Sequence, residues 1–98
     1  MGFAVPYAAV IEVDNSKEDA EAGRKGLRDE LAPALKSMPG FVSTLLMTAY
    51  ERGRGLAVVV FETQNQAELF AGGFLPGQEI RDGVVVTSAE VLEVSASA

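Results

Sequence analysis

Two stretches near the middle of the chain carry apolar residues at consecutive positions, and they constrain the fold more than any other feature. These stretches are Leu45–Met47 and Val58–Phe61. Successive residues of a strand point to opposite faces of a sheet, so strands of this kind need cover on both faces. A short polar loop with two glycines, Glu51–Gly55, lies between them. We therefore predict an antiparallel hairpin, with strands over Phe41–Tyr50 and Leu56–Glu62.

Before the hairpin, the sequence predicts a strand and a long helix. The strand covers Tyr7–Val13, and the helix covers Lys17–Ser37, where apolar residues recur at helical spacing. Pro33 has no amide hydrogen to donate within the helix, so we expect a kink or a restart near Leu31–Ala32. A turn at Pro39–Gly40 then leads into the hairpin.

The predicted long helix has two further features. Glu18, Asp19 and Glu21 crowd its first turn, where the helix dipole favours anions. Gly23 and Gly26 lie inside it, and each costs about 1 kcal/mol relative to alanine. We interpret these glycines as a sign that the helix packs closely on the sheet.

After the hairpin, the sequence predicts a second helix and a last strand. The capping-box pattern at Thr63–Gln66 predicts a helix that ends near Ala71. We expect an irregular loop over Phe74–Asp82. The last strand covers Val84–Val94 and is long enough to bend or bulge near Thr87–Ser88.

The predicted order is strand, helix, strand, strand, helix, strand, within one domain over residues 1–98. Two such split halves build an α+β, ferredoxin-like sandwich, with a four-stranded antiparallel sheet and two helices on one face. The hairpin strands are apolar on both faces, so the second sheet face remains apolar and uncovered. Such a face is a liability in a monomer, and two-fold homodimers are the commonest oligomers. We therefore predict a homodimer that packs through this sheet face.

The composition argues against several classes of function. The net charge of −6 and the lack of clustered basic residues argue against a nucleic-acid partner. The chain has no Cys and no His, which removes disulfides, thiolate nucleophiles, Ser-His triads and the commonest metal ligand. We expect no cofactor and no metal site. No apolar run is long enough to cross a membrane, and nothing requires an oxidising compartment, so we expect a cytoplasmic location.

Aromatic residues are the candidates for a ligand pocket. Tyr7 and Tyr50 would orient a phenolic molecule between the sheet and the helices, or they are sheet residues with a hydroxyl at the rim. Phe61, Phe70 and Phe74 would line an apolar cavity, or they belong to the core. No residue can be assigned a catalytic role from the pattern alone.

Four segments of the chain carry a resemblance to known proteins: Met38–Val42, Val59–Glu62, Gly83–Thr87 and Glu90–Val94. Together they resemble the dimeric α/β-barrel superfamily and, within it, the antibiotic-biosynthesis-monooxygenase-like group. The resemblance covers nearly the whole chain and implies a face-to-face homodimer of ferredoxin-like domains. The group includes cofactor-independent oxygenases of aromatic polyketides and quinone-type substrates, as well as heme-degrading enzymes.

The resemblance leaves two functions open. The heme-degrading branch uses His, Trp and Asn, and this chain has no His and no Trp, so we reject that function. We interpret the chain as a homodimeric α/β-barrel protein that binds a small apolar or aromatic ligand. The alternative is a cofactor-independent monooxygenase acting on an aromatic polyketide or a quinone-like substrate. In that reaction the substrate's own carbanion would activate oxygen, and the protein would supply a dry cavity and hydrogen bonds.

Overall fold

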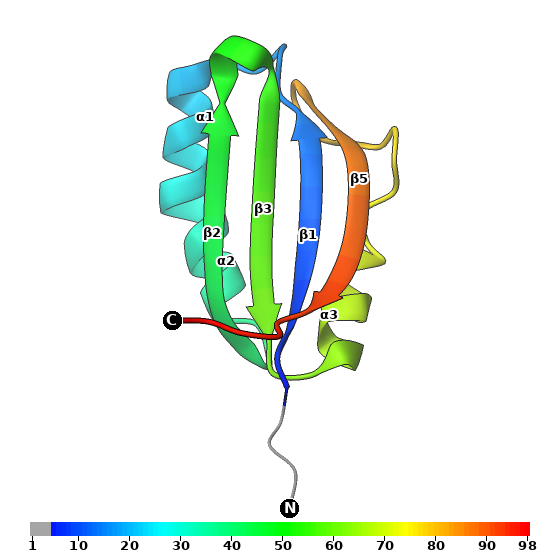
Figure 1. The fold of residues 1–98 in the computed structure, drawn as a ribbon. Coiled ribbons are helices and arrows are strands. Elements are labelled where there is room, and N and C mark those ends of the chain that lie inside the picture. Colours follow the sequence, from blue (N-terminus) through cyan, green and yellow to red (C-terminus); the bar gives the residue numbers. More distant parts are fainter. Residues whose placement is uncertain (1–4) are drawn as a thin grey trace, which may run out of the picture.

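The computed structural model describes residues 5–98 and centres on a five-stranded antiparallel sheet (Figure 1). The strands are β1 (Tyr7–Asp14), β2 (Phe41–Ala49), β3 (Arg54–Phe61), β4 (Glu79–Arg81) and β5 (Val84–Glu93). They lie in the order β2-β3-β1-β5-β4, and all neighbouring strands are antiparallel. The four long strands have the ferredoxin-like order, which confirms the predicted α+β class.

The predicted four-stranded sheet is wrong by one strand. β4 lies within the segment 74–82, where the sequence predicts only an irregular loop. Gly83 has a φ of 81°, and this turn folds β4 back onto the start of β5. Glu79 pairs with Val85, and Arg81 pairs with Val84. A strand of three residues is too short to show the alternation of apolar and polar residues that identifies strands in a sequence.

Two helical segments lie on one face of the sheet (Figure 1). The first consists of α1 (Ala20–Gly26), the π-helical turn η1 (Leu27–Leu31) and α2 (Ala32–Lys36), and the second is α3 (Gln64–Ala71). The π-helical turn confirms the interruption predicted before Pro33. Here the Ala32 amide bonds to the Leu27 carbonyl, five residues earlier. A π-helical turn is suited to this position because Pro33 has no amide hydrogen to donate to the carbonyl four residues earlier, as an α-helix requires.

The first helical segment begins later than the sequence predicts. It starts at Ala20 rather than Lys17, because Asp19 caps it by accepting a hydrogen bond of 2.9 Å from the Ala22 amide. Glu18 is therefore outside the helix, in the loop that connects β1 to α1. In the described part of the chain, no helix has both the length and the apolar character needed to cross a membrane.

Two local predictions are confirmed in the second half of the fold. The Thr63–Gln66 capping box is present at the start of α3. The pairing between β1 and β5 shifts after Glu12, because Glu12 faces Ser88 whereas Val13 faces Val86. Thr87 is therefore the extra residue of a bulge in β5, at the expected position.

The hydrophobic core lies between the sheet and the two helical segments. Its buried members are Ala9, Ile11, Leu35, Val59, Phe61, Ala67, Ala71 and Val86. Alternate residues of β1 and β3 supply half of this set, as the two-residue period of a strand requires. The core therefore forms a single layer of side chains between the helical segments and one face of the sheet.

The opposite face, which we call the outer sheet face, carries apolar side chains that no described helix covers (Figure 1). Leu45, Val58 and Val10 are direct neighbours across β2, β3 and β1. Leu45 is 65% exposed, and Leu92 on β5 is 50% exposed. The apolar face on which the predicted homodimer depends is thus present, while the homodimer itself stays a prediction.

The Pro-Gly turn connects the helical layer to the sheet. Gly40 has a φ of 78°, in the left-handed region that favours glycine. Its carbonyl accepts a hydrogen bond of 2.9 Å from the Glu62 amide, at the end of β3. The Gln66 side chain of α3 occupies the place that a β-carbon at Gly40 would need. The turn therefore contacts the end of β3 and the start of α3 at once, and it fixes where β2 begins.

Candidate functional site

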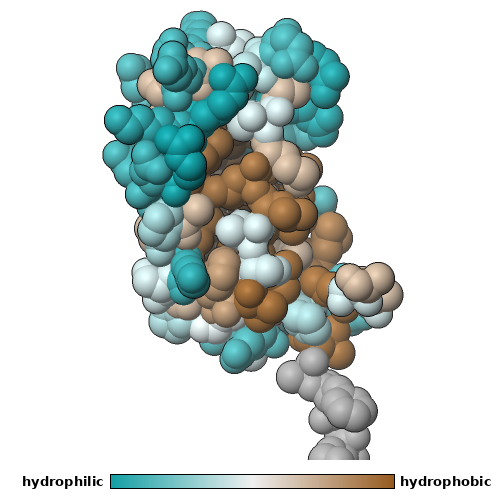
Figure 2. All heavy atoms as spheres, turned by 90° about the vertical axis from the view of Figure 1, so that its left-hand side faces the viewer, coloured by the Kyte–Doolittle hydropathy of each residue, from teal (hydrophilic) through white to brown (hydrophobic). Residues whose placement is uncertain are grey.

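A cavity of about 240 Å³ lies between the sheet and the helical segments. Apolar side chains surround a hollow on the side of the molecule that carries β2 (Figure 2). The apolar lining includes Ile11, Val13, Leu46, Ala57 and Val59 of the sheet, Leu27, Leu31 and Leu35 of the first helical segment, and Phe70, Phe74, Ile80 and Val84 from the second half of the chain. A mainly apolar cavity with a few polar groups is the usual form of a small-molecule site.

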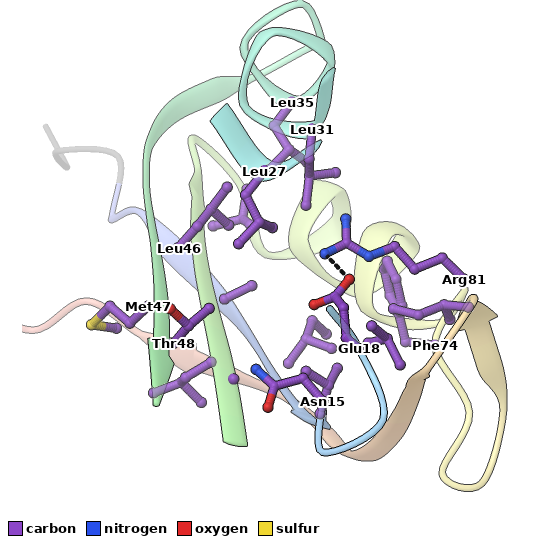
Figure 3. A pocket seen from close by; sticks show the side chains of 18 of the residues that line it. Asn15, Glu18, Leu27, Leu31, Leu35, Leu46, Met47, Thr48, Phe74 and Arg81 are labelled. Carbon is purple, nitrogen blue, oxygen red and sulfur yellow. Dashed lines mark ion pairs between the residues drawn. The ribbon is translucent and has the colours of Figure 1, made fainter. Parts of the chain in front are cut away.

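Small residues of the sheet and an irregular helix leave this space open. Gly55 and Ala57 of β3 line the cavity with almost no side chain of their own. Leu27, Leu31 and Leu35 enter from the helical side (Figure 3), and of these three only Leu35 is fully buried. The first two belong to the π-helical turn, and such turns are frequent at functional sites.

One end of the cavity is polar. Glu18, from the loop before α1, and Arg81, from β4, form an ion pair with an Nη2–Oε2 distance of 2.6 Å (Figure 3). The Glu18 side chain is 9% exposed and the Arg81 side chain 35%. Among the described residues that line the cavity, these two are the charged ones, and Asn15 and Thr48 add uncharged polar groups.

Two more residues join Glu18 and Arg81 in what we call the polar cluster. The Tyr50 hydroxyl donates a hydrogen bond of 3.3 Å to Glu18 Oε1. The Arg24 guanidinium lies 5.0 Å from the centroid of the Tyr50 ring, within the range of a cation–π contact. Burial raises the pKa of Tyr50, and the charge and the hydrogen bond of Glu18 raise it further, against the opposing charges of Arg81 and Arg24. Tyr50 therefore remains a protonated donor at neutral pH.

Gly23 of α1 makes room for the polar cluster, and Gly26 lies beside Arg81 of β4. A β-carbon at Gly23 would collide with the Tyr50 hydroxyl and the Glu18 carboxylate. A β-carbon at Gly26 would lie 3.4 Å from Arg81 Nη1. The glycine at position 23 lowers the helix propensity of α1 but lets the Tyr50 and Glu18 side chains approach the helix.

Buried polar atoms without a protein partner occur at the same end of the cavity. Asn15 is 2% exposed, and its Nδ2 donates to the Arg54 carbonyl at 3.1 Å. Its Oδ1 is buried with no hydrogen-bond partner in the described residues, and the same holds for Arg81 Nε. Each such atom costs about 1–3 kcal/mol. Two buried polar atoms at this end are therefore left for a partner other than the described residues.

The structure places the five predicted pocket residues in four different environments. Phe70 and Phe74 line the cavity, with ring centroids 5.0 Å apart. Phe61 is 1% exposed and lies in the core, 5.5 Å from the Phe70 ring. Tyr50 lies outside the lining and reaches it through Glu18. Tyr7 pairs with Phe61 at the start of β1, whereas the polar cluster lies beyond the end of that strand.

Sequence reasoning missed the polar end of the cavity. The sequence predicts that Glu18 lies in the first turn of a helix, where its charge would interact with the helix dipole. The helix instead begins at Ala20, so Glu18 lies before it and lines the cavity. Arg81 lies in a segment with no predicted structure, so nothing in the sequence connects it with Glu18. The available signal was the pair Gly23 and Gly26, since two glycines three residues apart mark a helix face that other groups approach.

Comparisons with known proteins bear on the fold. No protein-family model and no curated protein matches the chain. Among solved structures, the chain is similar to a heme-degrading protein from Mycobacterium tuberculosis, crystallised heme free with cleaved protein. The two are 18% identical over 98% of each chain, with a TM-score of 0.62. At this identity the likeness shows the shared fold: an α+β architecture built on an antiparallel sheet.

The cavity lining does not fit a heme. Proteins hold heme iron through His, Cys, Tyr, or Met together with His. This chain has no His and no Cys, and no Tyr is among the described residues that line the cavity. Within residues 5–98, no three His, Cys, Asp or Glu side chains are grouped so that they could hold a metal ion.

The environment of Tyr50 gives a testable pH dependence. In a Tyr7→Phe variant, Tyr50 is the single tyrosine, and its tyrosinate absorbance should appear above the ordinary pKa of about 10. Since the folded-state pKa is raised, the stability that protonated Tyr50 contributes is complete below pH 10 and is lost as pH rises through the folded pKa.

A second substitution identifies the cause. Glu18→Gln in the same background should move the Tyr50 midpoint back toward the ordinary value, because Glu18 raises it both by charge and by hydrogen bond. The exposed Glu30→Gln is the matched control and should leave the midpoint unchanged. A midpoint at the ordinary value in the Tyr7→Phe protein, or no response to Glu18→Gln, would contradict the described cluster.

Proposed function

We propose that this protein binds a small, largely apolar or aromatic molecule in the cavity between its sheet and its helical segments. The observation that carries the proposal is the cavity itself, about 240 Å³ in volume, with apolar walls and polar groups at one end. Apolar cavities of about 150 Å³ take up benzene, and pockets for drug-sized ligands begin near 300 Å³. The volume therefore suits a ligand of one or two rings.

The phenylalanines of the cavity favour an aromatic ligand. Phe70 and Phe74 lie at an interplanar angle of 52°, so they present differently oriented rings to the space beside them. Aromatic rings prefer tilted or offset contacts over a face-to-face stack. A planar ligand can meet both rings in this way while its polar group lies toward Glu18 and Arg81.

The proposal also includes an assembly and a family. The protein belongs to the dimeric α/β-barrel superfamily, in its antibiotic-biosynthesis-monooxygenase-like group, and forms a homodimer through the outer sheet face. The ferredoxin-like strand order supports the family, and the uncovered row of Leu45, Val58 and Val10 supports the dimer. Since the outer sheet face and the cavity lie on opposite sides of the sheet, such a dimer leaves the cavity accessible.

A cofactor-independent monooxygenase is the second candidate function, and the polar cluster is the observation that favours it. A mainly apolar cavity can take up an acidic aromatic substrate in its uncharged form, and the Arg81 N–H groups not bonded to Glu18 could donate to the oxygen of the carbanion once it forms. With an anthrone, the carbanion would reduce dioxygen, one oxygen atom would become the ketone oxygen and the other would leave in water. Oxygen uptake with an anthrone or a hydroquinone tests this candidate, and its absence alongside ligand binding leaves the first.

Filling the cavity should abolish ligand binding. Leu46→Trp adds an indole to the lining and should weaken the binding of toluene roughly tenfold or more, because the added volume overlaps the ligand. In the unchanged protein, toluene at ten times its Kd should raise the free energy of unfolding by about 1.4 kcal/mol. Thermal unfolding with and without toluene measures both effects.

The control for this experiment uses the same substitution at a surface position. Leu69 on α3 is 74% exposed, so Leu69→Trp adds an indole outside the cavity and should preserve toluene binding. If the unchanged protein gains no stability from toluene or from other one- and two-ring hydrocarbons, the proposed function is wrong.

The homodimer has its own test. Leu45→Glu places a charge in the middle of the apolar row on the outer sheet face, so it should convert a dimer to a monomer. Leu69→Glu introduces the same charge on α3 and should leave the dimer intact. Sedimentation equilibrium at micromolar protein measures the mass. A monomeric unchanged protein, or a dimer that persists with Glu at position 45, would rule out this interface.

A further inference from the structure

The charges that line the cavity cancel each other. Glu18 and Arg81 are the charged residues of the described lining, and they are bonded to each other at 2.6 Å. The remaining polar members, Asn15 and Thr48, are uncharged. The cavity therefore has polar groups at one end without a net charge.

We propose that this ion pair restricts the cavity to uncharged ligands that carry a hydroxyl or a carbonyl group at one end, such as alcohols, phenols and quinones. The proposal rests on the proposed function, because it names the chemical class of the ligand for the same cavity. An anionic ligand would have to take Arg81 from Glu18, or else lie beside the Glu18 carboxylate. A cationic ligand would have to take Glu18 from Arg81, or else lie beside the Arg81 guanidinium. Leaving the Glu18 carboxylate, whose side chain is 9% exposed, without its partner is strongly unfavourable.

An uncharged polar group avoids this cost. A guanidinium has five N–H donors, and a carboxylate has about four lone-pair positions. Within the described residues, Arg81 uses Nη2 toward Glu18, and Glu18 accepts from Arg81 and Tyr50. A ligand oxygen can accept from a remaining Arg81 donor, and a ligand hydroxyl can donate to a remaining Glu18 position. The ion pair stays intact in both cases.

The surroundings of the pair oppose its separation by a ligand. Both carboxylate oxygens of Glu18 have partners, since Oε2 meets Arg81 and Oε1 accepts from Tyr50. The Glu18 side chain is 9% exposed, so water is a poor substitute for a lost partner. Gly23 leaves space for the Glu18 carboxylate directly beside α1. The arrangement therefore holds both charges in place before any ligand arrives.

Three ligands of similar size test the proposal. Benzyl alcohol, benzoate and benzylamine share one ring and at pH 7 are neutral, anionic and cationic. The unchanged protein should bind benzyl alcohol at least roughly tenfold more tightly than either charged ligand, since neither charged ligand can pair with one member of the ion pair without displacing the other or lying beside a like charge. Isothermal titration calorimetry gives the three dissociation constants.

Two variants should change the preference in opposite directions. Glu18→Gln leaves the Arg81 cation without its anion and should improve benzoate binding roughly tenfold, without a gain for benzylamine. Arg81→Gln leaves the Glu18 anion and should favour benzylamine instead. Glu30→Gln lies at an exposed position outside the lining and makes the same change of net charge as Glu18→Gln. It should alter none of the three dissociation constants. Circular dichroism verifies that each variant is folded.

The outcomes separate the two proposals. If neither toluene nor benzyl alcohol binds, the proposed function fails and the ligand class fails with it. If toluene and benzyl alcohol bind and the unchanged protein takes benzoate equally well, only the ligand class is wrong. A folded Glu18→Gln protein with no gain for benzoate also overturns it. If one variant does not fold, the selectivity of the unchanged protein and of the other variant still shows whether the proposed ligand class is right.

Discussion

The central strands are apolar on both faces, and the rest of the chain is arranged around this constraint. In β1, Ala8 faces one side of the sheet and Ala9 and Ile11 face the other, yet all three are buried. The two helical segments cover one face only, so the core forms there and the outer sheet face stays open. A partner copy is the cover that we propose for the open face, because it presents an equally apolar surface in a closed two-fold arrangement.

The covered face is not completely filled, and the cause is local. A regular helix over large sheet residues would interdigitate to the density of an organic crystal. Here the π-helical turn before Pro33 and the small residues Gly55 and Ala57 prevent such contact. Side chains around a hollow lack partner atoms on one side and lose dispersion energy. An apolar molecule in the cavity restores those contacts, and this connects the irregularity of the helix to ligand binding.

The features of the fold that could be predicted from the sequence are those that depend on local interactions. The capping box at Thr63, the interruption before Pro33 and the bulge at Thr87 each follow from a residue and its immediate neighbours, and all three are present. β4 and the polar cluster depend on contacts between distant segments. Glu18 and Arg81 are 63 positions apart by their numbers, 81 minus 18, and they meet only because β4 folds back onto β5. Periodicity cannot reveal such a contact.

The ion pair in the cavity wall is difficult to explain by stability. Replacing a buried ion pair with apolar residues of similar volume is often neutral or stabilising, because removing two charges from water offsets their attraction. The arrangement also requires a glycine at position 23, where a β-carbon would collide with the Tyr50 hydroxyl and the Glu18 carboxylate, and this glycine lowers the helix propensity of α1. The chain instead holds two opposite charges at the end of an apolar hollow, with Tyr50 bonded to one of them. The ligand selectivity that we propose accounts for this arrangement better than the stability of the fold does.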